Sequence, residues 1–490
     1  MGVALRIKNH PILDFHHDQK IPFSFNGKNL QGYSNDTIAA ALHANGITKF
    51  SESLRFHRAR GFFCGIGKCS SCLMNVNGIP NVRTCIVPLK KDVRVNTQEK
   101  FASWPKKSVS KPDERMHDKI IDVLIVGGGP AGLEAAIQAA DHGAEVLLVD
   151  ENQLLGGQLI KQTHKFFGSK QENAGTRGIH IANQLADIIY NNEKIEVFLE
   201  STVFGYYEDI SSDLFTFAVS KRKGYESHTV KVQARTVIFA VGAMENMLLF
   251  PGNDLPGVYG AGAVQTLMNV YGVKPGEKVL MVGAGNVGLI VSYQLLQAGI
   301  IVDRVVEAAP VIGGYHVHAA KLRRCGVPIF TRHSIKEVNG SDHVESAVII
   351  KLDDNWQEIP DSEEIVTCDT ICLAVGLTPS TRLLGQLGVN MTTIPEAGGY
   401  VALHDEQMQT SIPGVFIAGD NSGIEEASTA MIEGKIAGVA AARKAGRTKD
   451  SNAEQSLSRF SEELARLRAG PFGEKPRIAK QKINASWRSK

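Results

Sequence analysis

A strand, a glycine-rich turn, a helix and a second strand follow one another twice in this chain, and this repeat constrains the fold more than any other feature. The first copy, IIDVLIVGGGPAGLEAAIQAADHGAEVLLVDE at 120–151, places Gly127, Gly129 and Gly132 in the three positions of G-x-G-x-x-G. The first glycine permits a tight turn, the second lets the backbone approach a pyrophosphate, and the third packs helix against strand. Asp150 ends the second strand, where a carboxylate can accept hydrogen bonds from ribose hydroxyls.

This first motif predicts a nucleotide cofactor whose phosphates face the N-terminus of the helix. FAD, NAD and ATP share the ADP half that the turn and Asp150 would bind, so the motif does not choose among them. The further residues that we assign to this cofactor site are Pro130, Ala131, Glu151, Gly157, Gln158 and Gly242.

The second copy, GEKVLMVGAGNVGLIVSYQLLQAGIIVDRVVEAAP at 276–310, predicts another dinucleotide-binding fold. Gly283, Gly285 and Gly288 are its glycines, and Glu307 is the candidate ribose acid. An acid at this position repels a 2′-phosphate, so a dinucleotide here is expected to be NAD(H) rather than NADP(H). The sequence leaves open whether this second site keeps its nucleotide.

Four cysteines near the N-terminus predict a [2Fe–2S] cluster. Cys64, Cys69, Cys72 and Cys85 follow the plant-type spacing of C-x4-C-x2-C with a lone fourth cysteine. The alternatives are a structural zinc site and a ligand set that no longer binds metal. Structural zinc sites commonly pair two short cysteine knuckles, and Cys85 has no such mate.

The segments around these cysteines predict a ferredoxin-like domain over 1–102. RIKNHPILDF and KIPFSFNGKNLQGY are typical of two strands, and SNDTIAAALHANGI of a short helix with Ser34 or Asn35 as its candidate N-cap and Gly46 as its stop. A stretch rich in Pro, Lys and Ser at 103–118 predicts a linker.

Composition excludes several classes of function. The net charge of +2 gives no reason to expect a nucleic acid partner, and no stretch approaches 18 consecutive apolar residues, so we expect no transmembrane segment. The N-terminus lacks an apolar signal-peptide core, and the seven cysteines are used as in a reducing compartment. We therefore expect a cytoplasmic protein.

Three further segments, VIFAVGAMEN, ICLAVGLTPS and TSIPGVFIAGD, resemble the two-dinucleotide flavoprotein family that includes thioredoxin reductase. The resemblance implies that Asp420, preceded by Gly419, contacts the ribityl chain of FAD. It also implies a discontinuous FAD-type domain at 119–245 and 373–446, interrupted by an NAD-type domain at 246–372, with a helix near the end of the FAD-type domain resting on it. The expected fold class is α/β: a β-grasp [2Fe–2S] ferredoxin-like domain followed by two Rossmann-like domains.

One departure from that family bears on function. Its disulfide reductases carry a pair of cysteines beside the flavin, whereas the segment at 154–168 contains no cysteine. Cys368 and Cys372 fall in a predicted buried strand. Disulfide chemistry is therefore excluded by the sequence.

The combination of a ferredoxin-like domain with this fold is similar to the α-type subunits of heteromeric amine-oxidising flavoenzymes. These include sarcosine oxidase, dye-linked proline dehydrogenase, opine oxidase and hydrogen cyanide synthase. The resemblance implies a hetero-oligomer with a glycine-oxidase-like β subunit that binds its own FAD, FMN at the subunit interface, and docking to an electron acceptor. We identify no catalytic residues for substrate oxidation in this chain, in agreement with chemistry housed in a partner.

Three functions remain open from the sequence. The first is an electron-transfer subunit of an amino- or imino-acid dehydrogenase or oxidase, the second a stand-alone NADH-dependent FAD/[2Fe–2S] reductase, and the third a non-catalytic subunit with a structural nucleotide. The tail at 447–490 predicts one helix, NAEQSLSRFSEELARLR, followed by a basic stretch. That stretch is expected to be either a frayed end or an arm that docks on the partner through Trp487.

Overall fold

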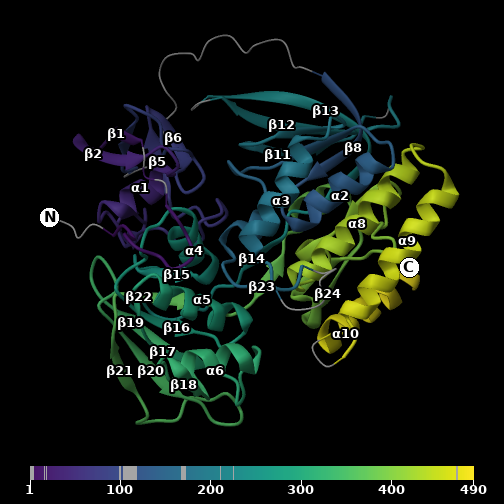
Figure 1. Ribbon diagram of the computed structural model, residues 1–490. Helices are drawn as coiled ribbons and strands as arrows, with labels where there is room; N and C mark the ends of the chain where they lie inside the picture. The colour runs from purple at the N-terminus through teal and green to yellow at the C-terminus, as the bar shows by residue number, and fades with distance from the viewer. Residues whose placement is uncertain are drawn as a thin grey trace. The chain divides into compact units, whose positions relative to one another are not determined.

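The computed structural model describes residues 5–15, 17, 19–98, 101–102, 118–166, 173–209, 211–223, 226–470 and 473–489. The chain forms two compact units, one made of Met1–Val109 with Glu245–Gly376 and the other of Ser110–Met244 with Leu377–Lys490 (Figure 1). The predicted linker lies outside the described residues except for its last residue, and the predicted domain boundaries stay a prediction. Among the described residues, none of the helices combines the length and apolar character that a bilayer crossing needs.

The cysteine-bearing part of the first unit is a five-stranded sheet in the order β2-β1-β7-β5-β6, next to a short helix (Figure 1). Its elements are β1 Lys20–Phe25, β2 Lys28–Tyr33, α1 Ile38–Ala44, β3 Ser51–Glu52, β4 Ala59–Arg60, β5 Leu73–Val76, β6 Ile79–Arg83 and β7 Arg94–Asn96. Every residue of α1 is buried, and the side chain of Thr37 caps the helix by accepting from the backbone N–H of Ala40. The ferredoxin-like fold predicted for this region is confirmed.

Three local predictions in this region are wrong. The segment at 20–33 is a hairpin rather than one strand, because Asn26 and Gly27 both have positive φ, as a tight two-residue turn requires. The segment at 6–15 contains no strand; it contributes one bridge, between Arg6 and Val273. The helix starts at Ile38 and its N-cap is Thr37 rather than Ser34 or Asn35, because the side chain of Thr37 accepts from the N–H of Ala40.

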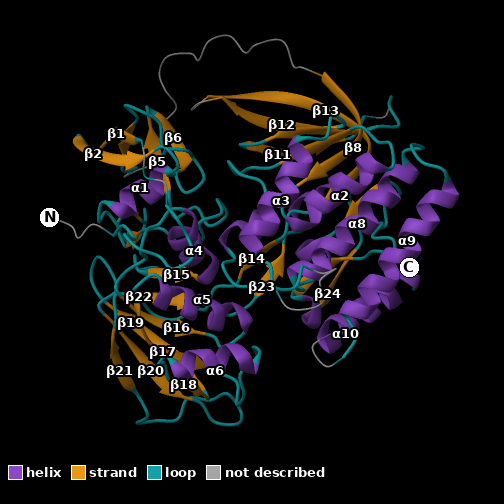
Figure 2. Cartoon of the chain, in the orientation of Figure 1, coloured by secondary structure: helices purple, strands orange, loops and turns teal. Residues whose placement is uncertain are grey.

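The second motif folds as a parallel sheet in the order β15-β22-β16-β17-β18, beside an antiparallel layer of β19, β20 and β21 (Figure 2). The elements are β15 Val258–Gly260, α4 Ala261–Gln265, a π turn at Thr266–Val270, β16 Lys278–Val282, α5 Asn286–Gln297, β17 Ile301–Glu307, α6 His316–Arg324, β18 Ile329–Thr331, β19 His333–Asn339, β20 Ser346–Lys351, β21 Glu364–Thr367 and β22 Thr370–Leu373. Continuous apolar runs such as KVLMV form these strands, as expected for a parallel sheet buried on both faces.

The second unit is built on a seven-stranded sheet, β10-β9-β8-β13-β12-β11, with β26 also pairing with β13. The strands of this sheet are β8 Asp118–Val126, β9 Val146–Val149, β10 Ile195–Phe198, β11 Ser201–Tyr207, β12 Phe215–Lys223, β13 Glu226–Phe239 and β26 Val415–Ile417. A separate two-stranded sheet consists of β24 Met391–Ile394 and β25 Gly399–Ala402. Short strands β14 Ala243–Glu245 and β23 Leu377–Pro379 lie where the chain passes between the units. Strands β10, β9, β8, β13 and β26 run parallel, so their carboxyl ends meet at one edge.

The helices of this unit include a closely packed pair, α2 and α8 (Figure 2). The helices are α2 Pro130–Asp141, α3 Gly178–Tyr190, α7 Arg382–Leu387, α8 Ala427–Lys444, α9 Asp450–Leu467 and α10 Glu474–Arg488, with 3-10 turns at Gly157–Lys161, Pro395–Ala397 and Gly419–Ser422. A Cβ at Gly434 or Gly438 of α8 would lie 2.1 or 2.4 Å from a carbonyl oxygen of α2. The glycines therefore allow the backbones of α2 and α8 to approach each other. The helix predicted near the end of the FAD-type domain is confirmed as α8.

The tail forms two helices that pack on the second unit. Helix α9 confirms the predicted helix and buries Ala453, Leu457, Phe460 and Leu464. The interpretation of the basic stretch as a frayed end is wrong, because α10 buries Ala479 and Ile483 against a small apolar cluster. Trp487 packs at the edge of that same cluster within its own chain.

Candidate cofactor sites

The four predicted cluster ligands lie together at one end of the ferredoxin-like sheet. All seven cysteines lie in the described part of the chain and are free, and Cys64, Cys72 and Cys85 are buried while Cys69 is half-buried. The thiol of Cys64 contacts those of Cys69 and Cys85, and the thiol of Cys72 contacts that of Cys85. These contacts lower the pKa values of Cys64 and Cys72 and raise those of Cys69 and Cys85, because thiols in contact do not all ionise together.

The backbone around these sulfurs is also suited to a cluster. Gly65 and Gly67 have φ of +65° and +69°, so the loop turns tightly enough for backbone N–H groups to reach sulfur. The N–H groups of Ile66 and Cys69 hydrogen-bond to the sulfur of Cys64 and favour its thiolate form. Such bonds stabilise negative charge on sulfur and tune the potential of an iron–sulfur cluster.

Four cysteine thiols in contact with one another fit a binuclear cluster, in which two thiolates bind each iron. Among the residues that the structure describes, no group of three or more His, Cys, Asp or Glu side chains is arranged to hold a single metal ion. The fit to a cluster therefore rests on the four sulfurs in contact and on the N–H groups directed at the sulfur of Cys64.

The cluster loop packs on the second nucleotide fold within the same unit. The carbonyl of Phe63 accepts a hydrogen bond from the N–H of Gly260 at 3.2 Å, and a Cβ at Gly65 would lie 3.4 Å from the Cα of Ala263 in α4. Arg6 joins the two folds again, because it pairs with buried Asp36 and donates to the carbonyl of Tyr271 at 2.9 Å.

The first glycine motif has the geometry that a nucleotide turn needs. Gly127 has φ of +107°, and a Cβ on Gly132 would lie 1.8 Å from the carbonyl oxygen of Gly127. By contrast, a Cβ on Gly129 would meet no atom closer than 4.0 Å. The first and third glycines are thus required by packing, whereas the second leaves open space at the N-terminus of α2, where Pro130 begins the helix.

The expected site residues of the second unit gather at the carboxyl edge of its parallel strands. Gly127 follows β8, Asp150 follows β9, Gly242 follows β13 and Gly419 follows β26. A Cβ on Gly419 would lie 2.9 Å from the Cβ of Ala131, so the final segment meets the first turn of α2. Ligands of open α/β sheets bind at such an edge.

Asp150 has a structural task that the sequence did not reveal. It is buried, its Oδ2 accepts from the N–H of Gly128 at 2.6 Å, and its Oδ1 accepts from the N–H of Asn152 at 2.7 Å. Burial raises its pKa, and the bonds from Asn152 and Gly128 oppose that rise. Oδ1 also accepts from the side-chain amide of Asn152 at 2.9 Å, whereas Oδ2 keeps a second lone pair, so a predicted bond from ribose to Oδ2 remains compatible with this arrangement.

The remaining predicted residues lie around the same turn. Gly157 has φ of +53°, and a Cβ there would lie 2.7 Å from the Cα of Gly129. Gln158 is exposed and Glu151 is half-buried. Gly242 has φ of +66°, and a Cβ on it would meet nothing within 4 Å. Gly129 and Gly242 each leave open space beside the backbone at this edge of the sheet, which fits an extended cofactor such as FAD.

The second motif repeats this geometry. A Cβ on Gly288 would lie 2.0 Å from the carbonyl oxygen of Gly283, and one on Gly285 would meet nothing within 4 Å. Glu307 accepts from the N–H groups of Ala284 and Ala309 at 2.8 and 2.9 Å, as Asp150 does from its own loop.

A pair of glycines follows each of the two ribose acids, Asp150 and Glu307, and the sequence prediction identified only part of this feature. The N–H of Gly156 donates to the carbonyl of Gly128 at 2.8 Å, and the N–H of Gly314 donates to that of Ala284 at 2.9 Å. The sequence prediction included Gly157 but missed the corresponding pair Gly313 and Gly314. The signal was present, because both pairs follow shortly after the acid that ends the second strand.

Asp420 lies in the turn at Gly419–Ser422, half-buried, and its Oδ1 is 3.4 Å from the backbone nitrogen of Glu425. Burial raises its pKa to about 6, the bond from Glu425 opposes this, and the charge of Glu433 adds to it. A carboxyl group in this state can accept from or donate to a hydroxyl, which suits the ribityl chain that the resemblance assigns to it.

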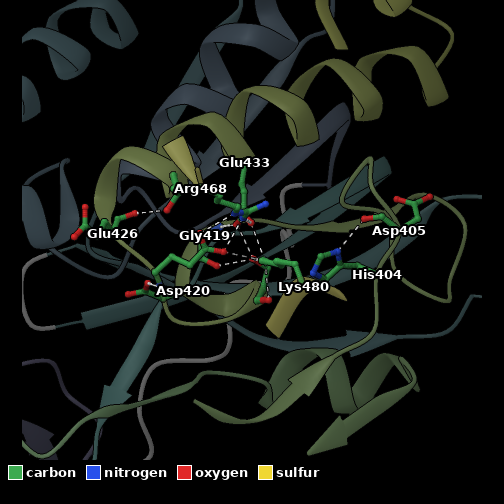
Figure 3. Close-up of polar contacts among 11 residues, drawn as sticks. His404, Asp405, Gly419, Asp420, Glu426, Glu433, Arg468 and Lys480 are labelled. Carbon is green, nitrogen blue, oxygen red and sulfur yellow. Dashed lines mark hydrogen bonds and ion pairs between the residues drawn. The ribbon is translucent and has the colours of Figure 1, made fainter. Parts of the chain in front are cut away.

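A buried ionic network holds the turn that carries Asp420, and sequence reasoning missed it entirely (Figure 3). Glu433 of α8 is 2% exposed. Its Oε2 accepts from the N–H of Gly419 at 3.0 Å and from the hydroxyl of Ser422 at 2.6 Å. Its Oε1 pairs with Arg468 at 2.6 Å and with Lys480 at 2.7 Å. Both cations come from the tail, too far along the chain for any local pattern to link them to Glu433.

Comparison with known proteins places this geometry in a family. Residues 121–434 match the model for pyridine nucleotide-disulphide oxidoreductases, and residues 18–100 match that for a 2Fe-2S iron-sulfur cluster binding domain. The chain is 25% identical to the alpha chain of sarcosine oxidase from Rhizobium meliloti over 88% of this chain and 46% of that protein. It is 27% identical to the HcnB component of hydrogen cyanide synthase from Pseudomonas protegens over 71% of this chain and 76% of that protein. The chain thus spans about half the length of the first relative and about three quarters of the second.

Solved structures show the same fold. L-proline dehydrogenase from P. horikoshii covers 92% of this chain, with 78% of its own chain matched, a TM-score of 0.68 and 24% identity. Thioredoxin reductase from T. acidophilum covers 66% of this chain, with 98% of its own matched, a TM-score of 0.53 and 21% identity. The predicted fold class, the resemblance to α-type subunits and the prediction of FAD and [2Fe–2S] are confirmed. The chain belongs to the pyridine nucleotide-disulphide oxidoreductase family, as an FAD-binding oxidoreductase that also carries a 2Fe-2S cluster-binding domain.

Proposed function

We propose that this chain is the electron-transfer subunit of a heteromeric flavoenzyme that oxidises an amino or imino acid of the proline, hydroxyproline, sarcosine or opine type. The observation that carries the proposal is the presence, on one chain, of four cysteine thiols in contact and an FAD-type fold, in a sequence similar to α-type chains of such enzymes. The substrate is oxidised in a glycine-oxidase-like β subunit that binds its own FAD, and FMN lies between the subunits.

The residues of this chain bind and orient the cofactors. The turn Gly127–Gly132 and the N-terminus of α2 hold the pyrophosphate, and Asp420 bonds to the ribityl chain. When bound, a flavin accepts electrons in pairs and an iron–sulfur cluster passes them on singly. The backbone N–H groups at Cys64 stabilise the added negative charge, and half-buried Cys69 gives the site its route toward an acceptor that docks from solvent.

A second candidate function has its own support in the second glycine motif. Gly283, Gly285, Gly288 and Glu307 keep the full geometry of a dinucleotide turn, and that fold packs directly against the cluster loop. This arrangement favours a stand-alone reductase that takes hydride from NADH, passes electrons through FAD and delivers them to its own cluster.

Purification of the chain alone separates these functions. The released cofactors are identified, and the bound flavin and cluster are followed by absorption after NADH is added without oxygen. The proposal expects FAD and iron with slow or no bleaching by NADH. Rapid bleaching with turnover in the absence of a partner would contradict it and establish the reductase.

Mixing with a candidate partner gives the positive test. A glycine-oxidase-like chain is added together with proline, hydroxyproline, sarcosine or an opine and an artificial acceptor. The proposal expects acceptor reduction that depends on both chains and is lost in the Cys69→Ser variant. Full activity of the partner without this chain would indicate a non-catalytic subunit whose nucleotide is structural.

A further inference from the structure

Two cationic side chains of the C-terminal tail, Arg468 and Lys480, lie beside Glu433 of the FAD-type fold (Figure 3). The side chain of Arg468, at the end of α9, is 14% exposed, and that of Lys480, in α10, is 10% exposed. Arg468 pairs with both Glu433 and Glu425, each at 2.6 Å. Lys480 donates to the hydroxyl and the carbonyl oxygen of Ser422 at 2.7 and 3.0 Å. Arg468 and Lys480 are therefore buried, paired cations and not part of a solvated basic tail.

Glu433 depends on these cations for its charge. Burial alone raises the pKa of this carboxyl, but Lys480 and Arg468 more than offset that effect, and its pKa lies well below the usual range. In its ionised form Glu433 accepts from the N–H of Gly419 and from Ser422, the two ends of the turn that contains Asp420. An uncompensated buried carboxylate would be strongly unfavourable, so it would either take up a proton or move.

We propose that the C-terminal helices form a latch for the flavin site, in which Arg468 and Lys480 are positioning residues that hold Glu433 ionised and thereby fix the turn Gly419–Ser422. The latch consists of α9, Arg468 and α10. Its ligand is the FAD of the second unit, reached through Asp420. The proposal rests on the assignment of Gly419 and Asp420 to the flavin and needs no partner chain or amine substrate.

The test measures FAD binding by the full chain. FAD is removed and then titrated back, with binding followed by flavin fluorescence, and iron content per chain is determined in parallel. The variants Lys480→Met and Arg468→Met remove one charge each while keeping an apolar stem. We expect FAD affinity to fall at least tenfold, with iron content unchanged, because the cluster cysteines belong to the other unit.

Matched controls come from the same helix. Lys482 pairs with Glu396 and Arg488 with Glu406, both at exposed positions of α10. Lys482→Met and Arg488→Met remove the same charges from the same helix without touching Glu433, and should leave FAD affinity unchanged. Equal losses in control and test variants would overturn the proposal, since general charge rather than the latch would then be responsible.

Two further variants separate positioning from simple stability. Arg468→Lys keeps the charge and should bind FAD close to the wild-type affinity, whereas a loss as large as that of Arg468→Met contradicts the proposal. Where Lys480→Met yields no folded protein, Lys480→Gln decides the question, because it keeps a donor but no charge. Wild-type FAD affinity in that variant would overturn the latch. Because no partner is present, failure of the proposed electron-transfer function would leave these results unchanged.

Discussion

Two glycines of the first motif, Gly129 and Gly132, are predicted to respond differently when each is replaced by alanine. A Cβ on Gly132 would lie 1.8 Å from the carbonyl oxygen of Gly127, so Gly132→Ala forces α2 away from β8. Overpacking of this kind costs about 1–3 kcal/mol in stability. A Cβ on Gly129 meets nothing closer than 4.0 Å, and its φ of −77° suits alanine. Gly129→Ala therefore costs at most about 1 kcal/mol, through weaker capping of α2.

Gly129→Ala should nevertheless weaken the binding of FAD strongly. The methyl group of Gly129→Ala occupies space that the pyrophosphate needs, so the phosphate no longer approaches the backbone N–H groups of the turn. Loss of about two hydrogen bonds to a charged group, at about 1.5 kcal/mol each, removes about 3 kcal/mol. Such a loss corresponds to roughly a hundredfold weaker affinity for FAD.

The assay combines an FAD titration with urea unfolding of the FAD-free chain. Gly129→Ala should bind FAD about a hundredfold more weakly at nearly unchanged stability, whereas Gly132→Ala should lose both. Gly285→Ala is the matched control, because its Cβ also meets nothing within 4 Å but lies in the other motif. Wild-type affinity of Gly129→Ala for FAD would refute the assignment of this turn to the pyrophosphate.

Three further outcomes are expected. Cys69→Ser should abolish the visible absorption of the iron–sulfur cluster while FAD content is retained; persistence of that absorption would show that Cys69 is not a ligand. Burial, followed by the charge of Lys480, lowers the pKa of His404 from 6.5 to about 4, so stability present above pH 6.5 is lost as the pH falls toward 4. The loss is about 2 kcal/mol at about pH 5, measurable from urea midpoints and absent in His404→Gln. Arg6→Met leaves buried Asp36 unpaired and should lower stability by about 3 kcal/mol in thermal unfolding followed through the cluster.

Features that depend on local spacing were predictable from the sequence. The cysteine spacing and the two glycine turns each bring their residues together within a single loop or a strand-turn-helix unit, so the residues meet wherever the rest of the chain folds. The acid at Asp150 was found for the same reason. Its second role, bracing the N–H of Gly128, was not, because a pattern shows that a carboxylate is present but not how many donors surround it.

Features that depend on distant parts of the chain were not predictable. Lys480 and Glu433 lie in different helices, and a basic, weakly apolar segment such as EKPRIAKQKINASWR is equally typical of a solvated end. Only the buried partner explains why a lysine stands at that position. The hairpin at Asn26–Gly27 is the opposite case, since its turn signal was present in the sequence and the segment was nevertheless interpreted as one strand.

Reduction of the cluster by substrate tests the central proposal most directly. The full chain is combined with a glycine-oxidase-like partner, an amino or imino acid is added without oxygen, and the reduced cluster is detected by electron paramagnetic resonance. The proposal predicts a reduced-cluster signal that requires both the partner and the substrate and that is missing in Cys69→Ser. A cluster that stays oxidised while the partner oxidises substrate, or one that NADH reduces rapidly in this chain alone, would contradict it.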